Sequence, residues 1–288
     1  MGAMTIKSPQ TTLVLGGTGR TGSLVARKLI QRGLSARTAA RHGADVRFDW
    51  DDTTTHARAL DGVDRIYLVT PVLRLQYARQ VSTFLDLAEV AGVRHVTHLS
   101  TYASDQAPSE IDIRAVELDL MGRGALTHSI LRPAWVMQNF SDDHLPIIEG
   151  VITVPSGGGA EAFVDATDIA AVAVETLVDP DTHAGAQYAP TGPAALTFAE
   201  VADIIAGVIG RPVTHNDIDR DAWINGAVAA GFVPAEYAVM LRWLTGMIAS
   251  GSGSRPNDDV EKVTGRPPVD FESFARRTAH SWTSQAVG

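Results

Sequence analysis

The sequence contains no cysteine and no long apolar run. The absence of cysteine from its 288 residues excludes disulfide bonds and thiol catalysis, and it fits a reducing compartment. No stretch reaches the apolar length of a membrane span, and the first residues lack the apolar core of a signal peptide. We therefore expect a cytoplasmic protein with no membrane partner.

Basic residues are also in short supply. Lys and Arg number 24 against 33 Asp and Glu, which gives a net charge of −9 at pH 7. A nucleic-acid surface needs an excess of basic side chains, so the composition argues against a nucleic-acid partner. Any anion site must be local. With 45% hydrophobic residues, the chain can bury a full core as one large domain or as one domain with a smaller lobe.

The most informative stretch lies near the N-terminus. Apolar residues at 12–15 run into glycines spaced as Gly16, Gly19 and Gly22, and a helical pattern follows that ends at Gly33. Such glycines allow a tight turn, leave no side chain between the backbone and a diphosphate, and let the helix lie close to the strand. The helix N-terminus then favours an anion. We predict dinucleotide binding here, with a purely structural glycine turn as the alternative.

The first half of the chain alternates short apolar runs with helical patterns. This alternation is typical of a parallel sheet covered on both faces. Right-handed crossovers place the C-terminal ends of all strands at one edge, where ligands bind. We therefore predict an α/β fold, a Rossmann-type doubly wound parallel sheet with a smaller, mainly helical C-terminal lobe. The predicted strands are 12–15, 36–40, 46–48, 65–69, 95–100 and 129–131.

Beyond Pro133 the pattern becomes mainly helical. A capping-box spacing from Thr197 to Glu200 predicts the start of a helix, and Gly210 predicts its end. In the predicted helix 234–249, five apolar residues share one face, which suits either core packing or a lid over a substrate. The other predicted elements are a loop at 155–159, helices at 165–178 and 221–230, a strand at 187–189, and short helices near 258 and 270.

The end of the second predicted strand bears on the choice of nucleotide. An NAD site usually has an acidic residue there, whereas here the strand is followed by Arg41. Arg41 suits a 2′-phosphate, and Arg20 of the glycine loop suits the other side of a clamp. A solvated surface arginine is the alternative for each. NADP(H) is therefore the preferred cofactor. Asp49 lies either near the adenine or at the start of the helix after Thr53, as its cap.

A dedicated proton donor for a reduced ketone is missing from the sequence. Short-chain dehydrogenases commonly supply one from a tyrosine whose partner lysine follows four residues later. None of the five tyrosines has lysine at that spacing, and the chain has only Lys7, Lys28 and Lys262. Hydride addition to an iminium neutralises an existing positive charge and creates no oxyanion. Chemistry of this kind needs little acid help and is easier to explain.

Three polar residues where the fifth predicted strand ends are the best remaining candidates. We predict that Ser100 binds the cofactor and that Thr101 contacts the substrate. Tyr102 is the candidate catalytic residue, as a substrate-orienting group or a proton donor, with a packing role as the alternative. We predict no metal site, because His95 and His98 are three residues apart in a strand and point to opposite faces.

Several stretches together resemble the NmrA-like atypical short-chain dehydrogenases. Within that family the similarity is greatest to the festuclavine synthase-like reductases of ergot alkaloid biosynthesis and their bacterial relatives. The resemblance spans nearly the whole chain. It rests on residues 13–22 (LVLGGTGRTG), 48–52 (FDWDD), 131–140 (LRPAW with QNF), 163–170 (FVD with DIA) and 265–271 (GRPP with DF).

The resemblance implies an NADP-binding domain, here residues 1–155. The remaining sheet elements, at about 160–190, and a substrate-binding lobe that closes over a cleft then fall in residues 156–288. Many members carry a histidine four residues before the glutamate matched by Glu117, but Ile113 stands there in this chain, which puts chemistry dependent on that histidine in doubt. Position by position, the resemblance assigns the diphosphate to Gly16, Thr18, Gly19, Arg20, Thr21 and Gly22, the 2′-phosphate to Arg41, the ribose side to Thr70 and Pro71, and the nicotinamide to Pro133, Ala134 and Trp135.

The same resemblance suggests where the substrate lies. We expect Trp135, Asn139 and Phe140 to contact it, with core packing as the alternative for the two aromatic residues. The expected function is an NADPH-dependent oxidoreductase that delivers hydride to an activated small organic acceptor, an iminium C=N, a C=C or a quinone. The alternatives are a non-catalytic NADP-binding sensor and a redox-neutral enzyme of natural-product biosynthesis.

Overall fold

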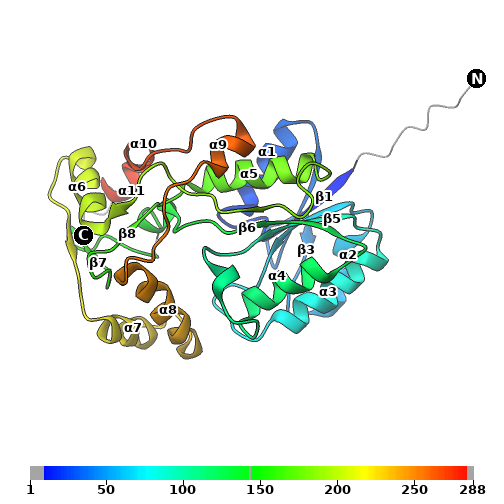
Figure 1. Cartoon of the computed structure of the whole chain (residues 1–288), viewed down its shortest axis with the longest axis horizontal. Coiled ribbons are helices and arrows are strands. Elements are labelled where there is room, and N and C mark those ends of the chain that lie inside the picture. Colours follow the sequence, from blue (N-terminus) through cyan, green and yellow to red (C-terminus); the bar gives the residue numbers. More distant parts are fainter. Residues whose placement is uncertain (1–9, 143, 284–288) are drawn as a thin grey trace, which may run out of the picture. The chain divides into compact units, whose positions relative to one another are not determined.

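A computed structural model of the chain describes residues 10–142 and 144–283, which form two compact units (Figure 1). Unit 1 consists of the described residues up to Pro71 together with Gln76–Arg132 and Ile169–Tyr188. Unit 2 consists of Val72–Leu75, Pro133–Asp168 and the described residues from Ala189 onward. None of the described helices combines the length and the hydrophobicity needed to cross a bilayer.

Unit 1 is built on a parallel sheet of seven strands in the order β3-β2-β1-β4-β5-β6-β9. Because the strands are parallel, their C-terminal ends meet at one edge, as the sequence pattern predicts. The predicted Rossmann-type sheet is confirmed. The strands are β1 Thr11–Leu15, β2 Ser35–Ala40, β3 Val46–Arg47, β4 Arg65–Val69, β5 His95–Leu99, β6 Thr127–Leu131 and β9 Gln187–Tyr188.

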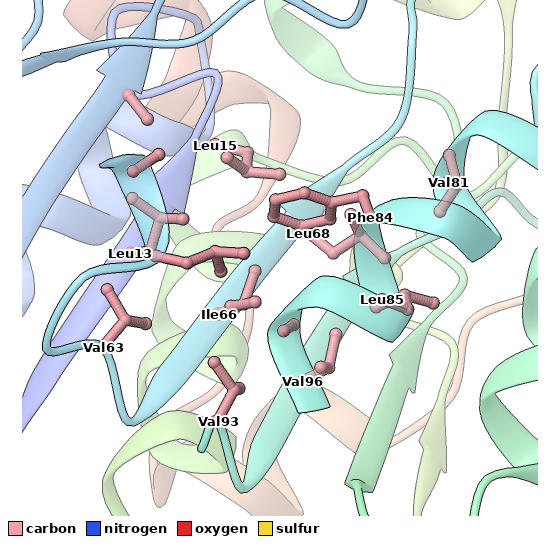
Figure 2. Close-up of a cluster of buried hydrophobic side chains, with 14 of the residues drawn as sticks. Leu13, Leu15, Val63, Ile66, Leu68, Val81, Phe84, Leu85, Val93 and Val96 are labelled. Atoms are coloured by element: carbon pink, nitrogen blue, oxygen red, sulfur yellow. The ribbon is translucent and has the colours of Figure 1, made fainter. Parts of the chain in front are cut away.

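Helices cover both faces of this sheet. On one face, Leu13, Ile66 and Leu68 point toward the side chains of α3, as Figure 2 shows. On the other face, Thr97 of β5 lies 2.8 Å from Thr176 of α5 between their hydroxyl oxygens. Alternate residues of a strand face opposite sides, so each strand contributes to both layers. The helical elements of this part are α1 Gly22–Gln31, η1 Thr53–Thr55, α2 His56–Leu60, α3 Ala78–Val90, η2 Ser104–Gln106, α4 Asp112–Gly122 and α5 Ala166–Val178.

Unit 2 has an aromatic core between short strands and helices. Phe140 lies 5.3 Å from Phe163 and 5.4 Å from Phe271 between ring centroids. The predicted capping box of Thr197 and Glu200 is confirmed at the start of α6. The elements are η3 Met137–Phe140, β7 Val151–Thr153, β8 Ala160–Glu161, β10 Leu196–Thr197, α6 Phe198–Ile209, β11 Thr214–Asn216, α7 Arg220–Ala229, η4 Ala235–Tyr237, α8 Ala238–Ala249, α9 Asp259–Thr264, α10 Phe271–Thr278 and α11 His280–Thr283.

The predicted helix 234–249 is shorter than expected. Residues 235–237 form the 3₁₀ turn η4, and α8 begins only at Ala238. Of the five apolar residues on its predicted face, Ile248 is fully buried, while Tyr237, Met240, Leu241 and Leu244 are half-buried. The core reading therefore holds at the C-terminal end of α8 and only in part before it.

Two buried carboxylates near the start of α5 hold the C-terminal segment of unit 2. Asp165 accepts the Thr167 N–H at 2.7 Å and pairs with Arg277. Asp168 pairs with Arg266 at 2.6 Å and accepts the Val269 N–H at 2.7 Å. Both carboxylates are fully buried. Burial raises the pKa of Asp168, whereas the Val269 N–H and Arg266 oppose that rise. Two of the stretches behind the family resemblance thus form one cluster.

Replacing Arg266 by methionine is expected to lower the free energy of unfolding by about 2 kcal/mol, because the buried Asp168 carboxylate would lose its cationic partner. Urea denaturation of the two proteins measures the difference. Lys262→Met is the matched control, since Lys262 pairs with Asp258 at the surface, where ion pairs contribute little. Equal stability of Arg266→Met and the parent chain would contradict a stabilising role for this cluster.

Candidate functional site

The glycine loop between β1 and α1 is shaped by one left-handed glycine and by two close approaches to its carbonyl group. Gly16 has a φ of +62°, in the left-handed region that suits glycine. A Cβ atom at Gly22 would lie 2.3 Å from the Gly16 carbonyl oxygen, so α1 packs directly against the loop. The Gly19 N–H donates to the same carbonyl at 2.8 Å. These contacts fit the roles that the motif predicts for a tight turn and a close helix.

Gly17 has a role that the motif spacing does not reveal. A Cβ atom there would lie 2.6 Å from Cβ of Thr38 on β2. The Gly17 N–H donates to the Ala39 carbonyl at 3.1 Å, which ties the loop to the neighbouring strand. The signal in the sequence is the pair Gly16-Gly17 itself, but only the register of β1 and β2 shows which contact the second glycine serves.

The N-terminus of α1 has no anionic side chain of its own. Its first turn, residues 22–25, contains no Asp or Glu, and the Thr21 side chain makes no capping hydrogen bond within the described chain. In contrast, α6 begins with a complete capping box. The partial positive charge of α1 is therefore available to an external anion.

The loop after β2 lies beside the glycine loop. A Cβ atom at Gly43 would be 3.7 Å from Cγ2 of Thr18. Asp45 closes this loop by accepting hydrogen bonds from the Thr38 N–H at 2.8 Å and from its hydroxyl at 2.7 Å. Arg41 begins the loop and is exposed. The structure thus brings the predicted diphosphate loop and the segment of Arg41 together.

Asp49 follows β3, but it does not cap the next helix. That position belongs to Asp52, which accepts the Thr54 N–H at 3.2 Å. The capping alternative for Asp49 is therefore wrong. The Asp49 carboxylate accepts the Asp51 N–H at 3.1 Å, and the Asp49 carbonyl accepts from the His56 imidazole at 2.9 Å. The adenine prediction for Asp49 stays open.

Ser100, at the end of β5, belongs to a buried polar network. Its hydroxyl donates to Glu117 at 2.6 Å, and the Ser104 hydroxyl does the same at 2.6 Å. Arg132 donates twice to Glu117, at 2.9 and 2.8 Å, and Arg114 donates once at 2.8 Å. Burial alone would raise the pKa of Glu117, but these four partners lower it to about 2. The Ser100 hydroxyl hydrogen is thus donated to Glu117, and the contact of Ser100 with the cofactor stays a prediction.

The residues after Ser100 are more accessible. Thr101 and Tyr102 are half-buried, and Ala103 adopts a φ of +58°, an uncommon conformation for a residue other than glycine. Ile113 lies on α4 one turn before Glu117 and is half-buried. Tyr102 keeps its place as the candidate substrate-orienting residue. Thr70 and Pro71 occupy the corresponding position after β4, half-buried and buried respectively.

The predicted nicotinamide and substrate residues after β6 belong to unit 2. Pro133 and Ala134 are buried, and the Ala134 N–H donates to the Pro190 carbonyl at 3.0 Å. Trp135 is half-buried and lies 6.1 Å from Phe198 between ring centroids, edge to face. Asn139 is also half-buried.

Phe140 lies in the core of unit 2. It is 1% exposed and packs among aromatic rings, and its carbonyl accepts the Trp282 indole N–H at 2.5 Å. Phe140 therefore matches the alternative given above, a role in core packing. A side chain so enclosed has no free surface for a substrate, so we leave Phe140 out of the site.

Two histidines of β5 are neutral structural groups. The His95 imidazole lies 2.9 Å from the Thr127 hydroxyl, and that of His98 lies 3.4 Å from the Leu68 carbonyl. Burial lowers the pKa of His95 to about 3 and that of His98 to about 4. Neither imidazole is therefore protonated to an imidazolium at neutral pH, and neither suits the role of a general acid.

Comparison with known proteins identifies the family and the fold of the chain. The sequence pattern of the NmrA-like family matches residues 8–244. A crystal structure of the NADPH-dependent quinone oxidoreductase QOR2 from Escherichia coli, in complex with NADPH, has the same fold, with a TM-score of 0.73 and 20% identity. The match covers 93% of this chain and 99% of that one.

Three relatives are similar over nearly the whole sequence. The uncharacterised oxidoreductase YesF of Bacillus subtilis is 37% identical over 94% of this chain and 96% of its own length. The NAD(P)H azoreductase of Xenophilus azovorans is 32% identical over 93% and 97%, respectively. Festuclavine dehydrogenase easG of Aspergillus fumigatus is 31% identical over 94% and 99%. The predicted resemblance is confirmed: this chain belongs to the NmrA-like family.

Proposed function

We propose that the chain is an NADPH-dependent reductase that delivers hydride to an activated small organic acceptor, such as an iminium C=N, a C=C or a quinone. The observation that carries this proposal is the junction of β1 and α1. There α1 packs directly on the glycine loop through Gly22 and Gly16, and its first turn contains no acidic side chain. Named relatives that are oxidoreductases support the same reaction class.

The residues present at this junction fit a phosphorylated dinucleotide. The amides of the glycine loop and the N-terminus of α1 would hold the diphosphate. Arg41, on the loop that packs at Thr18, would pair with the 2′-phosphate through its planar guanidinium. Thr70 and Pro71 would line the ribose. We assign the diphosphate, the 2′-phosphate and the ribose to residues of unit 1. In unit 2, Pro133 and Ala134 stay predicted nicotinamide contacts, and Trp135 and Asn139 stay predicted substrate contacts. Thr101 and Tyr102 of unit 1 keep their predicted substrate roles.

When bound, the reduced cofactor supplies the hydride. The role of the protein is to position the two reactants and to exclude water. The buried histidines of β5 are neutral, and Glu117 is ionised and fully paired, so neither offers a proton. An acceptor that already carries positive charge, or that can delocalise negative charge, needs no such donor. Tyr102 orients the acceptor in this proposal.

An acceptor screen tests the reaction. The purified protein is first titrated with NADPH by fluorescence and then assayed for NADPH oxidation with a cyclic iminium, a quinone, an enone and an unactivated ketone. We expect turnover with at least one activated acceptor and none with the ketone. Binding of NADPH without turnover of any acceptor would instead favour the non-catalytic sensor.

Replacing Arg41 by alanine is expected to raise the Kd for NADPH about tenfold or more and to leave that for NADH nearly unchanged, since a charge-assisted pair to the 2′-phosphate is lost. Fluorescence titration with both nucleotides measures this. Arg58→Ala, which removes an exposed arginine of α2, is the matched control. Equal weakening of NADPH and NADH would remove the basis for the phosphorylated cofactor.

A further inference from the structure

Two side chains of β4, Val69 and Tyr67, lie on the face of the sheet next to the glycine loop and the start of α1. A Cβ atom at Gly16 would lie 3.6 Å from Cβ of Val69. Tyr67 is two residues earlier in the same strand and therefore faces the same side of the sheet. It pairs in register with Val14 of β1 and is 0% exposed. The Tyr67 phenol is thus enclosed beneath the start of the loop and of α1.

The Tyr67 hydroxyl is fully buried and has no hydrogen-bond partner among the described residues. Burial raises the pKa of this hydroxyl, and the neighbouring Thr21 side chain lowers it in part. Other polar groups on this face of the sheet are paired, since Thr97 bonds Thr176 at 2.8 Å and His95 bonds Thr127 at 2.9 Å. A lone buried hydroxyl is unfavourable, and phenylalanine would fill the same space without that cost.

The neighbour of this hydroxyl is the residue that precedes α1. Thr21 occupies the capping position, yet its side chain makes no capping bond within the described chain. A threonine hydroxyl has one hydrogen to donate and two positions at which it can accept. When the Thr21 hydroxyl accepts a hydrogen bond from the Tyr67 hydroxyl, its own hydrogen stays available to an anion at the N-terminus of α1.

We propose that Tyr67 is a positioning residue for the diphosphate: its buried hydroxyl donates to the Thr21 hydroxyl in the nucleotide complex, and Thr21 in turn donates to a diphosphate oxygen. This inference rests on the proposed function. It gives the buried Tyr67 hydroxyl a partner in the neighbouring Thr21 side chain. No proton leaves either hydroxyl, because both bonds are ordinary donations.

Isosteric variants test the proposal. Tyr67→Phe, Thr21→Val and the double variant are titrated with NADPH, and the melting temperature of each is measured without nucleotide. We expect Tyr67→Phe to raise the Kd about fivefold and to melt no lower than the parent chain, because it removes an unpaired hydroxyl. Thr21→Val should weaken binding at least as much, and the double variant should bind like Thr21→Val alone.

A second tyrosine provides the comparison for a structural role. The hydroxyl of Tyr188 on β9 lies 2.7 Å from the His183 imidazole, so Tyr188→Phe should lower the melting temperature and leave the Kd unchanged. The same behaviour in Tyr67→Phe would overturn the proposal, as would multiplicative effects in the double variant. If the parent chain itself fails to bind NADPH, both this inference and the proposed function are wrong. A parent chain that binds while Tyr67→Phe binds equally well overturns only the inference.

Discussion

Replacing Gly22 by alanine is expected to weaken NADPH binding at least a hundredfold. The new methyl group would lie 2.3 Å from the Gly16 carbonyl oxygen and 2.8 Å from its carbonyl carbon. Van der Waals contact requires roughly 1 Å more, and both obstacles are backbone atoms that cannot rotate away. The helix must therefore move off the loop, which separates the two sources of diphosphate contacts. Fluorescence titration gives the Kd, and calorimetry gives the melting temperature.

Gly122 offers a matched control for this substitution. It ends α4 without a left-handed φ, and a Cβ atom there would have nothing within 4 Å. Gly122→Ala should bind NADPH like the parent chain and melt at the same or a slightly higher temperature, since alanine loses less backbone entropy on folding. If Gly22→Ala binds within threefold of the parent, the loop does not hold the diphosphate as proposed.

Removal of the Glu117 carboxylate is expected to lower the free energy of unfolding by about 4 kcal/mol. In Glu117→Ala, the guanidinium of Arg132 would stay largely buried without its anion, and the Ser100 and Ser104 hydroxyls would lose their acceptor. Domains are stable by only about 5 to 15 kcal/mol, so a large part of the margin would disappear. Urea denaturation at neutral pH measures the loss.

The same carboxylate predicts how stability depends on pH. The folded state lowers the pKa of Glu117 from 4.5 to about 2. A lowered acid pKa means that the unfolded chain binds the proton more readily, so the contribution of Glu117 is complete above pH 4.5. It is lost as the pH falls toward 2, by about 3 kcal/mol in all. Denaturation across this range should show the drop in the parent chain and a smaller one in Glu117→Gln.

Glu272→Ala is the comparison for both measurements. Glu272 pairs with Arg276 on the exposed surface of α10, and the side chains are 57% and 69% exposed. Ion pairs of this kind contribute little to stability. A Glu117 variant no less stable than Glu272→Ala would mean that the network around Ser100 does not stabilise unit 1.

Most of unit 1 can be predicted from the sequence because its central strands β1, β4, β5 and β6 are mostly buried, and a buried strand favours a short apolar run. The predicted strand at 65–69 coincides with β4, and those at 12–15 and 36–40 differ from β1 and β2 by one residue each. In unit 2 the strands β7, β8, β10 and β11 have two or three residues each, too few to show an alternating pattern. The sequence does not predict them.

In the candidate site, too, contacts set by local spacing can be predicted from the sequence, whereas contacts between distant residues cannot. The glycine loop and its neighbour after β2 follow from local spacing, and the structure brings them together at Thr18 and Gly43. Ser100 could not be placed from the sequence alone. Its partner Glu117 lies 17 residues further along, on a helix, and Arg132 joins from just beyond β6. The resemblance marks Glu117, but no local pattern predicts which hydroxyl it binds. Tyr67 likewise looks like an ordinary strand residue in the sequence, because only the structure shows that its hydroxyl is fully buried.

The pairs between α5 and the C-terminal segment bear on the order in which the chain becomes folded during synthesis. Asp165 and Arg277 are 112 residues apart, and Asp168 and Val269 are 101 apart. A nascent chain therefore carries both carboxylates long before their partners exist, while the strands β1 to β6 are already available to pair. Until the last helices emerge from the ribosome, both carboxylates must stay hydrated. Nascent unit 2 should accordingly remain sensitive to proteases after unit 1 has become resistant.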